Sequence, residues 1–283
     1  MSSTTALPTD ATPPSTVSDD ELDAITRRAV SDLHVPRPAV FWTDLIASAT
    51  IGWAAFAVAV ATTPWSAGML AACVVSALAL YRGLCFTHEL THLRRGSIPG
   101  FETAWNLLFG VPLLLPSFTY LGVHQSHHSL STYGTKDDPE YLPFARSRRL
   151  IVTFAFQASV LTPIALVARF LLLAPIGLVW PRFHRFLETY ASSFSMNPEY
   201  RRTMTPAAAA KMRRWEMGVL AFWVAAIALI AMGVLPARTP LVWYGVLGFV
   251  SFLNTARVLG AHEYDSDGMK LAPRARVKRS TRS

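Results

Sequence analysis

Two histidine-rich windows stand close together in this chain: His88-Glu89-Leu90-Thr91-His92 and His124-Gln125-Ser126-His127-His128. They hold five of the eight histidines in the 283-residue sequence. Residues three and four apart share one face of a helix, so each window presents its imidazoles together. Imidazole is the commonest protein ligand of first-row transition metals. One such pair arises easily by chance, but two adjoining clusters do not, and the windows therefore predict a metal site.

The composition is that of a membrane protein. Hydrophobic residues make up 52% of the chain and charged residues only 16%, and the mean hydropathy is +0.31. The net charge of +8 lies mostly in loops beside long apolar runs, where it sets topology or contacts anionic lipid. Nothing resembles a nucleic-acid-reading helix or a stacking platform, so we expect no nucleic-acid partner.

Four apolar runs are long enough to cross a membrane as helices. Residues 40–62 and 66–86 form one predicted hairpin, and residues 215–235 and 241–260 form a second. Each run reaches the length of about 20 residues that spans the ~30 Å hydrocarbon core. The junction at 63–65 carries no Lys or Arg, so the positive-inside rule places the opposite ends of the helices, and both histidine windows, in the cytoplasm.

Two further apolar stretches are interrupted by proline. Residues 104–122 are too short and broken for a span, and we predict a re-entrant or interfacial segment. Residues 150–180 would, by crossing once, place the basic loop 181–214 and His262 on the far side, so we predict an interfacial or re-entrant segment here too. The expected fold is an all-α membrane protein with four transmembrane helices in two hairpins, interfacial or re-entrant helices and a cytoplasmic histidine cap.

Two metal chemistries remain open from these residues. The first window reads as HExxH, which in zinc metalloproteases supplies two zinc ligands and a glutamate base, here Glu89. That interpretation leaves the second window without a role. A dinuclear iron site for oxygen activation, built from many imidazoles at helix ends, uses both windows.

The text around the windows resembles the membrane fatty-acid desaturase and hydroxylase family, in particular its bacterial branch. The similar stretches are Phe86-Thr87-His88, Pro116-Ser117-Phe118, Gly122-Val123-His124, Tyr133-Gly134-Thr135, Asp137-Asp138-Pro139-Glu140-Tyr141 and, at the last apolar run, Asn254, Arg257 and Ala261-His262-Glu263-Tyr264. Together they extend over about residues 40–268. The resemblance implies a bacterial inner-membrane location.

The resemblance also implies an oxygen-dependent enzyme with two iron ions. It would desaturate or hydroxylate a lipid acyl chain, with electrons from a separate ferredoxin- or cytochrome-type donor. No catalytic residue is expected beyond the metal site. The metal ligands carried over by position are His88, His92, His124, His127, His128 and His262. Asn254, Glu89 and Arg257 are expected to support these ligands from outside the coordination sphere.

Several other residues are expected to be structural. Asp137 and Asp138 are interpreted as loop residues or as support for the ligands. His184 is expected on the surface. Four tryptophans fit the aromatic belt of a bilayer, namely Trp42, Trp65, Trp215 and Trp243.

The chain departs from the family at its C-terminal end. The family's third histidine box is missing, because no histidine follows His262. We expect a polar, partly disordered segment at 1–38, a desaturase-like membrane domain at 39–268 and a basic tail at 269–283, which would bind anionic lipid or reflect a truncation or frameshift. The ligand set for two irons is then incomplete, and a non-catalytic relic is a third hypothesis.

Overall fold

A computed structural model describes residues 36–261, except 95, 130, 134, 142–146 and 198. The chain divides into two units, Met1–Arg37 and Pro38–Ser283, and the described helices belong to the second. The N-terminal segment, His262 and the basic tail lie outside the described residues.

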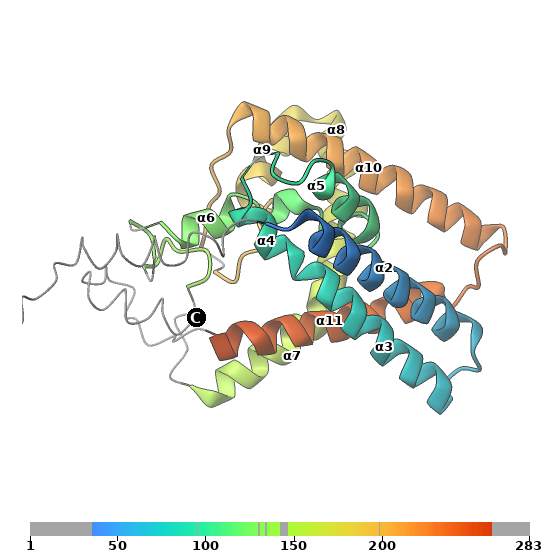
Figure 1. Ribbon diagram of the computed structural model, residues 1–283. Helices are drawn as coiled ribbons and strands as arrows, with labels where there is room; N and C mark the ends of the chain where they lie inside the picture. Colours follow the sequence, from blue (N-terminus) through green and yellow to red (C-terminus); the bar gives the residue numbers. More distant parts are fainter. Residues whose placement is uncertain are drawn as a thin grey trace, which may run out of the picture. The chain divides into compact units, whose positions relative to one another are not determined.

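The described part of the chain is helical. The elements are α2 (Pro38–Ala61), α3 (Ala67–Leu84), α4 (Phe86–His92), α5 (Phe101–Trp105), η2 (Asn106–Gly110), η3 (Ser117–Thr119), α6 (Val123–His127), α7 (Arg148–Val167), η4 (Ala168–Leu173), α8 (Ala174–Val179), α9 (Pro181–Tyr190), α10 (Pro206–Ala231) and α11 (Thr239–Ala261) (Figure 1). The predicted all-α fold is confirmed.

Five helical stretches are long and apolar enough to cross a membrane. They are Pro38–Ala61, Ala67–His92, Arg149–Val179, Pro206–Ala231 and Thr239–Gly260. Four of them coincide with the predicted hairpins. The fifth covers the stretch predicted to be interfacial, so the predicted count of four spans is approximate.

That fifth stretch is continuous because its prolines are accommodated. Pro163 lies within α7, and the second proline, Pro175, occupies the first turn of α8, where a missing N–H costs little. The π-helical η4 joins the two helices. Figure 1 shows α7 rising toward α8 across the direction of α10 rather than alongside it.

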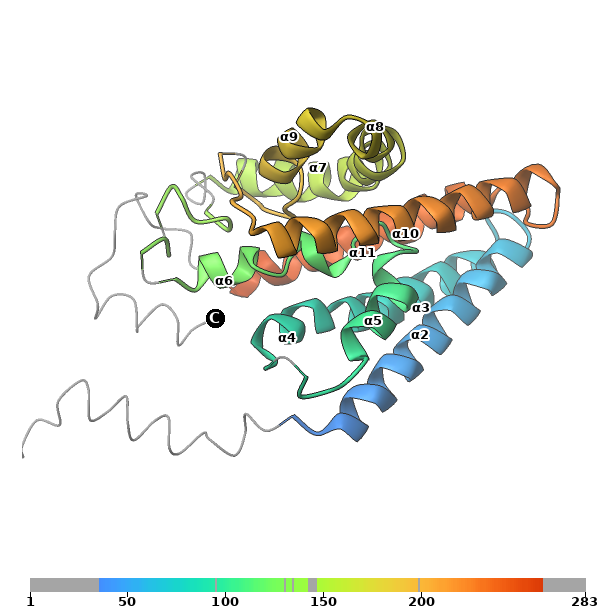
Figure 2. The same ribbon diagram turned by 90° about the horizontal axis from the view of Figure 1, so that it is seen from above.

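The first hairpin brings α2 and α3 into close contact. Gly52 makes the approach possible, since an added Cβ there would lie 2.6 Å from the Leu80 side chain. Ser66 caps α3 by accepting a hydrogen bond from the Met69 N–H at 3.1 Å. Figure 2 shows α2 and α3 running side by side, and α4 continues from the end of α3. The first histidine window is therefore held at the end of a membrane hairpin.

The segment from α5 to η3 is irregular and short-helical, and it is not among the five described stretches long and apolar enough to cross. Irregular backbone at membrane depth requires hydrogen-bond partners from its neighbours. Three indole N–H groups from α2, α10 and α11 donate to carbonyl oxygens in this segment: Trp53 to Leu108 at 2.8 Å, Trp223 to Val111 at 3.1 Å and Trp243 to Pro112 at 2.9 Å. The aromatic-belt interpretation is wrong for Trp243, which is 7% exposed because its polar end has an internal partner.

A buried amide closes the same segment on itself. Asn106 Nδ2 donates to the Glu102 carbonyl at 2.8 Å and to Ser117 Oγ at 2.9 Å. The Ser117 N–H donates to Asn106 Oδ1 at 2.8 Å. These bonds bring the two ends of the segment together, and the chain returns toward the end of α3 that carries the first histidine window.

A second buried polar group joins η4, α9 and α10. Glu216 has no exposed surface; it accepts a hydrogen bond from Arg169 and lies 3.0 Å from His184 Nε2. The Nδ1 atom of His184 lies 2.8 Å from Glu188. The prediction that His184 is a surface residue is therefore wrong: only 5% of it is exposed, because it satisfies the buried carboxylate of Glu216.

Candidate metal centre

The two histidine windows form two short helices, α4 and α6, whose side chains face one another. Gly122 precedes α6 with a φ of 85°, a left-handed conformation that glycine adopts without strain. Phe101 of α5 fixes the start of α4 by packing edge-on against Phe86, with ring centroids 5.3 Å apart. The rings of His88 and His124 come within 4.6 Å, centroid to centroid.

Four histidines converge on one point. One nitrogen from each of His88, His92, His124 and His128 lies within 4.8 Å of all the others. Two ligands on opposite sides of an ion, each bonded at about 2.1 Å, are about 4.2 Å apart. The four imidazoles therefore fit around a single transition-metal ion after small side-chain movements.

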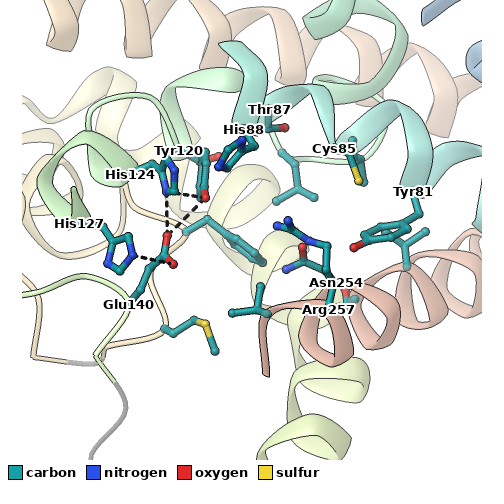
Figure 3. A pocket seen from close by; sticks show the side chains of 18 of the residues that line it. Tyr81, Cys85, Thr87, His88, Tyr120, His124, His127, Glu140, Asn254 and Arg257 are labelled. Carbon is teal, nitrogen blue, oxygen red and sulfur yellow. Dashed lines mark hydrogen bonds and ion pairs between the residues drawn. The ribbon is translucent and has the colours of Figure 1, made fainter. Parts of the chain in front are cut away.

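Acidic and phenolic side chains hold His124 from behind. Its Nδ1 atom lies 3.0 Å from Glu140 Oε1 and 2.8 Å from the Tyr120 hydroxyl, which itself donates to Glu140 at 3.3 Å (Figure 3). A proton on Nδ1, bonded to the carboxylate, leaves the Nε2 lone pair for a metal. Sequence reasoning assigned no role to Tyr120 or Glu140. The sequence indicates a role for Glu140 only through its position in the Asp137–Tyr141 stretch, which resembles the desaturase and hydroxylase family.

His127 has its own carboxylate. Its Nδ1 atom lies 2.8 Å from Asp138 Oδ1, and its Nε2 atom lies 3.7 Å from Glu140 Oε2. Asp138 is 2% exposed, whereas the adjacent Asp137 is exposed. The two aspartates, predicted together as loop or supporting residues, thus differ: Asp138 orients a histidine and Asp137 does not.

The protonation of the cluster suits metal binding. Burial, reinforced by the neighbouring histidines, lowers the pKa of His128 to about 4. Burial also lowers the pKa of His124 despite its hydrogen bond to Glu140. For His127 burial acts in the same direction, but the bond to Asp138 and the charge of Glu140 raise its pKa overall. His124 and His128 are therefore neutral near pH 7, as coordination requires.

A loop after α9 clamps the Asp138–Glu140 turn. The Asn197 side chain donates to the Lys136 carbonyl at 2.7 Å and to the Asp138 carbonyl at 2.8 Å. The N–H groups of Met196 and Asn197 both donate to the Pro139 carbonyl at 3.0 Å. Because these bonds fix the backbone between the two acids, they also fix the direction of both carboxylates.

Arg202 joins the same loop to the approach to α6. Its guanidinium donates to the Phe118 carbonyl at 2.6 Å, to the Ser192 carbonyl at 2.9 Å and to the Leu121 carbonyl. Burial lowers the pKa of this guanidinium, but arginine stays charged at any physiological pH. The charged guanidinium of Arg202 thus fixes the backbone that leads to the second histidine window, through hydrogen bonds to its carbonyl groups.

The histidines line a cavity of about 410 Å³. Asn254 and Arg257, at the end of α11, line it as well and point into it in Figure 3. Glu89 does not line it; its side chain is half exposed and lies 3.5 Å from His88 Nδ1. The structure therefore brings together five of the six predicted ligands, with His127 beside the four-histidine group, and His262 lies outside the described residues.

A second cavity of about 290 Å³ adjoins the first between α7 and α11. Residues common to both linings are Phe194, Met196, Ser251, Asn254 and Val258. Its other walls are mainly apolar and come from α7, including Phe154, Ala158 and Leu161. The cavity that the imidazole cluster lines is thus continuous with a second, largely apolar cavity.

Comparisons with known proteins agree with this arrangement. The family profile described as fatty acid desaturase matches residues 62–282. A ceramide hydroxylase from Caulobacter vibrioides (strain NA1000 / CB15N) is 39% identical over 255 residues, which cover 88% of this chain and 71% of the relative. No solved structure matches the chain significantly. Fold, site and matches define an integral membrane oxidoreductase of the lipid desaturase and hydroxylase type. More narrowly, the chain belongs to the fatty acid desaturase family.

Proposed function

We propose that the chain hydroxylates a membrane lipid, and that the lipid is amide-linked, of the ceramide type. The observation that carries this proposal is the four-histidine group in a cavity that continues into an apolar one. The choice of hydroxylation over acyl-chain desaturation rests on the similarity to a ceramide hydroxylase. Desaturation is the second candidate, because the family profile carries that name.

The proposed reaction consumes O2, two electrons and two protons. One oxygen atom enters a C–H bond to give C–OH, and the other leaves as water. Iron, when bound, would supply the activation of oxygen; two ions are proposed from the family resemblance. His88, His92, His124 and His128 would hold one of them, and His127 and His262 are proposed for the other. The electrons are proposed to come from a separate ferredoxin- or cytochrome-type donor.

The chain's own residues orient these ligands and shape the space for lipid. Glu140 and Tyr120 hold the proton on His124 Nδ1, and Asp138 does the same for His127. The apolar part of the two cavities excludes water from the hydrocarbon that is to be oxidised. The lipid would enter from the α7–α11 side, where the second cavity lies.

The zinc-protease alternative has less support. In that mechanism the glutamate of HExxH acts as base on a metal-bound water, so it must face the metal. Glu89 instead lies at the His88 Nδ1 atom and outside the cavity. The second window supplies two members of the four-histidine group, which a protease of this type does not need.

We also propose the membrane and the side on which the site lies. A bacterial inner membrane follows from the family resemblance and is consistent with the Caulobacter relative. The cytoplasmic side follows from the arginines that flank the site and the hairpin ends, among them Arg82, Arg94 and Arg149.

Lipid analysis tests the proposal. The chain is expressed in bacteria supplied with ceramide, iron, and a ferredoxin with its reductase, and lipids are analysed by mass spectrometry. We expect ceramide with one added oxygen, which disappears under chelation and in the His124→Ala variant. A new double bond instead would support desaturation. Absence of any iron-dependent lipid product, or cleavage of a peptide by the zinc-loaded chain, would contradict the proposed function.

A further inference from the structure

The cavity with the histidines has a polar wall on the opposite side. Arg257 and Asn254 reach into it from α11, and Tyr81 reaches into it from α3 (Figure 3). These three side chains carry hydrogen-bond donors and are separate from the histidine cluster. The cavity between the two walls also has apolar contacts from Leu84 and Val250. A ligand in this space meets donors on one side and the metal centre on the other.

Arg257 differs from two other arginines of the membrane helices, Arg82 and Arg169. Arg82 is paired with Asp44 and Arg169 with Glu216. In the described ranges, no ion pair joins Arg257 to an acid, and its only acidic neighbour in the cavity lining is Glu140. An arginine that only snorkels turns its guanidinium toward the membrane surface. Arg257 is an exposed residue, but its side chain lines the cavity and points into it (Figure 3).

The Tyr81 hydroxyl gives a second, independent indication. It is a buried polar atom that, within the described part of the chain, has no hydrogen-bond partner. Buried hydroxyls are normally satisfied, so an exception in a cavity indicates a place where a ligand or water bonds. The hydroxyl belongs to a residue that lines the same cavity as Arg257. The Tyr81 hydroxyl and the Arg257 guanidinium thus share one wall of the cavity.

We propose that Arg257, Tyr81 and Asn254 bind the uncharged polar group of the lipid, an amide carbonyl or a hydroxyl. The donor set favours an uncharged group, since Arg257 is the only Lys or Arg among the described residues that line the cavity. Phosphorylated groups are typically held by clusters of arginines. A carboxylate, which one arginine can hold with two hydrogen bonds, is the alternative that a fatty-acid probe tests. The identity of the bound lipid rests on the proposed function, from which the lipid class is taken.

The position of this wall determines where the lipid is oxidised. A polar group held by Arg257 places the carbon atoms next to it beside His88 and His124, which line the same cavity. The remaining hydrocarbon then extends through the shared residues into the α7–α11 cavity. Oxidation therefore occurs near the polar group and not far along the chain.

Binding measurements on the full-length chain in detergent micelles test this inference without requiring turnover. The probes are radiolabelled short-chain ceramide, an alkane of matched length and stearate. In Arg257→Leu we expect ceramide affinity to fall about tenfold or more, the loss typical of a charge-assisted hydrogen bond, with alkane affinity unchanged. Arg149→Leu is the control, since Arg149 is exposed and lines neither cavity.

Each other outcome has a distinct meaning. Unchanged ceramide affinity in Arg257→Leu, or an equal loss for ceramide and alkane, overturns the proposed contact. Stearate binding that is tighter than ceramide binding and depends on Arg257 overturns the uncharged group. If ceramide binds through Arg257 but no oxidised lipid forms, the proposed function fails and this contact stands. Where product forms, Arg257→Leu is expected to spread the hydroxyl to carbons farther from the amide.

Discussion

His124 and His128 face each other across one turn, with their Nε2 atoms 2.9 Å apart. Two nitrogen lone pairs at this separation repel unless a proton or a metal ion lies between them. The lowered pKa values of both rings disfavour an added proton near neutral pH. The pair therefore either shares the ring proton of one neutral imidazole or directs both lone pairs at one cation, and His88 and His92 complete the group that would surround such a cation.

Removal of one member of this pair tests the metal site. His128→Ala is expected to weaken metal binding by at least tenfold, because even supporting residues typically contribute about 10–100-fold to affinity. Gln125→Ala is the matched control: Gln125 is an exposed residue of α6 that does not line the cavity, and its amide donates to the Thr91 carbonyl at 3.3 Å. Titration of the purified chain with Fe²⁺ and Zn²⁺ gives both affinities. Equal affinities in the two variants would show that the four histidines do not form the site.

The adjacent residues Asp137 and Asp138 test whether a carboxylate beside His127 supports lipid oxidation. Asp138→Asn removes the carboxylate that holds His127 Nδ1, whereas Asp137→Asn changes an exposed side chain. We expect iron-dependent lipid oxidation to fall about 10–100-fold in the first variant and to stay near wild type in the second. The readout is product formation per iron bound. Similar activities would mean that Asp138 serves only the loop, where its Oδ1 also accepts from the Glu140 N–H at 2.8 Å.

The parts of the fold that depend on local pattern were predictable from the sequence. Apolar runs identified both hairpins, and i, i+4 spacing identified the faces that carry His88, His92, His124 and His128. Spacing could not identify Glu140, because it reaches His124 through a turn fixed by Asn197, more than fifty residues away. A carboxylate in a polar loop with two other acids, Asp137 and Asp138, looks solvated in the sequence.

Buried polar partners were missed for the same reason. Trp243 and His184 are residue types that usually occur near surfaces or interfaces, and their hydrogen-bond partners are distant in sequence. Trp243 bonds the Pro112 carbonyl, and His184 bonds Glu216. The α7–α8 stretch stays a prediction: it was predicted to be interfacial or re-entrant from the side of the basic loop that follows it, yet it is long and apolar enough to cross, and one of its prolines begins a helix.

The buried Glu216 carboxylate has a measurable effect on stability. Glu216→Gln keeps the shape but leaves Arg169 without its charged partner, which typically costs about 3–5 kcal/mol when a buried pair is broken. Glu188→Gln removes the other partner of His184 at a partly exposed position, with an expected cost below about 1 kcal/mol. Thermal unfolding in detergent compares the two. Equal midpoints would contradict a structural role for the Arg169–Glu216 pair.

The number of crossings can be tested by topology. We expect reporters at Arg185 and at residue 94 to be cytoplasmic and a reporter at Thr63 to be periplasmic, because basic loops stay in the cytoplasm. The α7–α8 stretch is nevertheless long enough to cross. A periplasmic signal at Arg185 would establish five crossings and place α9 on the far side. The reporter at residue 94 is the control for the side of the first histidine window.

The last prediction concerns how much iron the chain holds. The described residues provide one four-histidine group and, beside it, one further histidine of the cavity lining, His127. Ferrous iron stands low in the affinity order of divalent metals, so a poorly completed second position holds it weakly. We therefore expect fewer than two irons per purified chain, and slow lipid oxidation.

Metal analysis after anaerobic loading and desalting measures the stoichiometry, with His88→Ala as the variant that lowers it further. Zinc should compete effectively for the four-histidine group, because it binds imidazole more tightly than Fe²⁺ does. Two tightly held irons together with rapid turnover would show that other side chains complete the centre. In that case carboxylates already beside the cluster, Glu140 first among them at 3.7 Å from His127 Nε2, would be the ligands to substitute next.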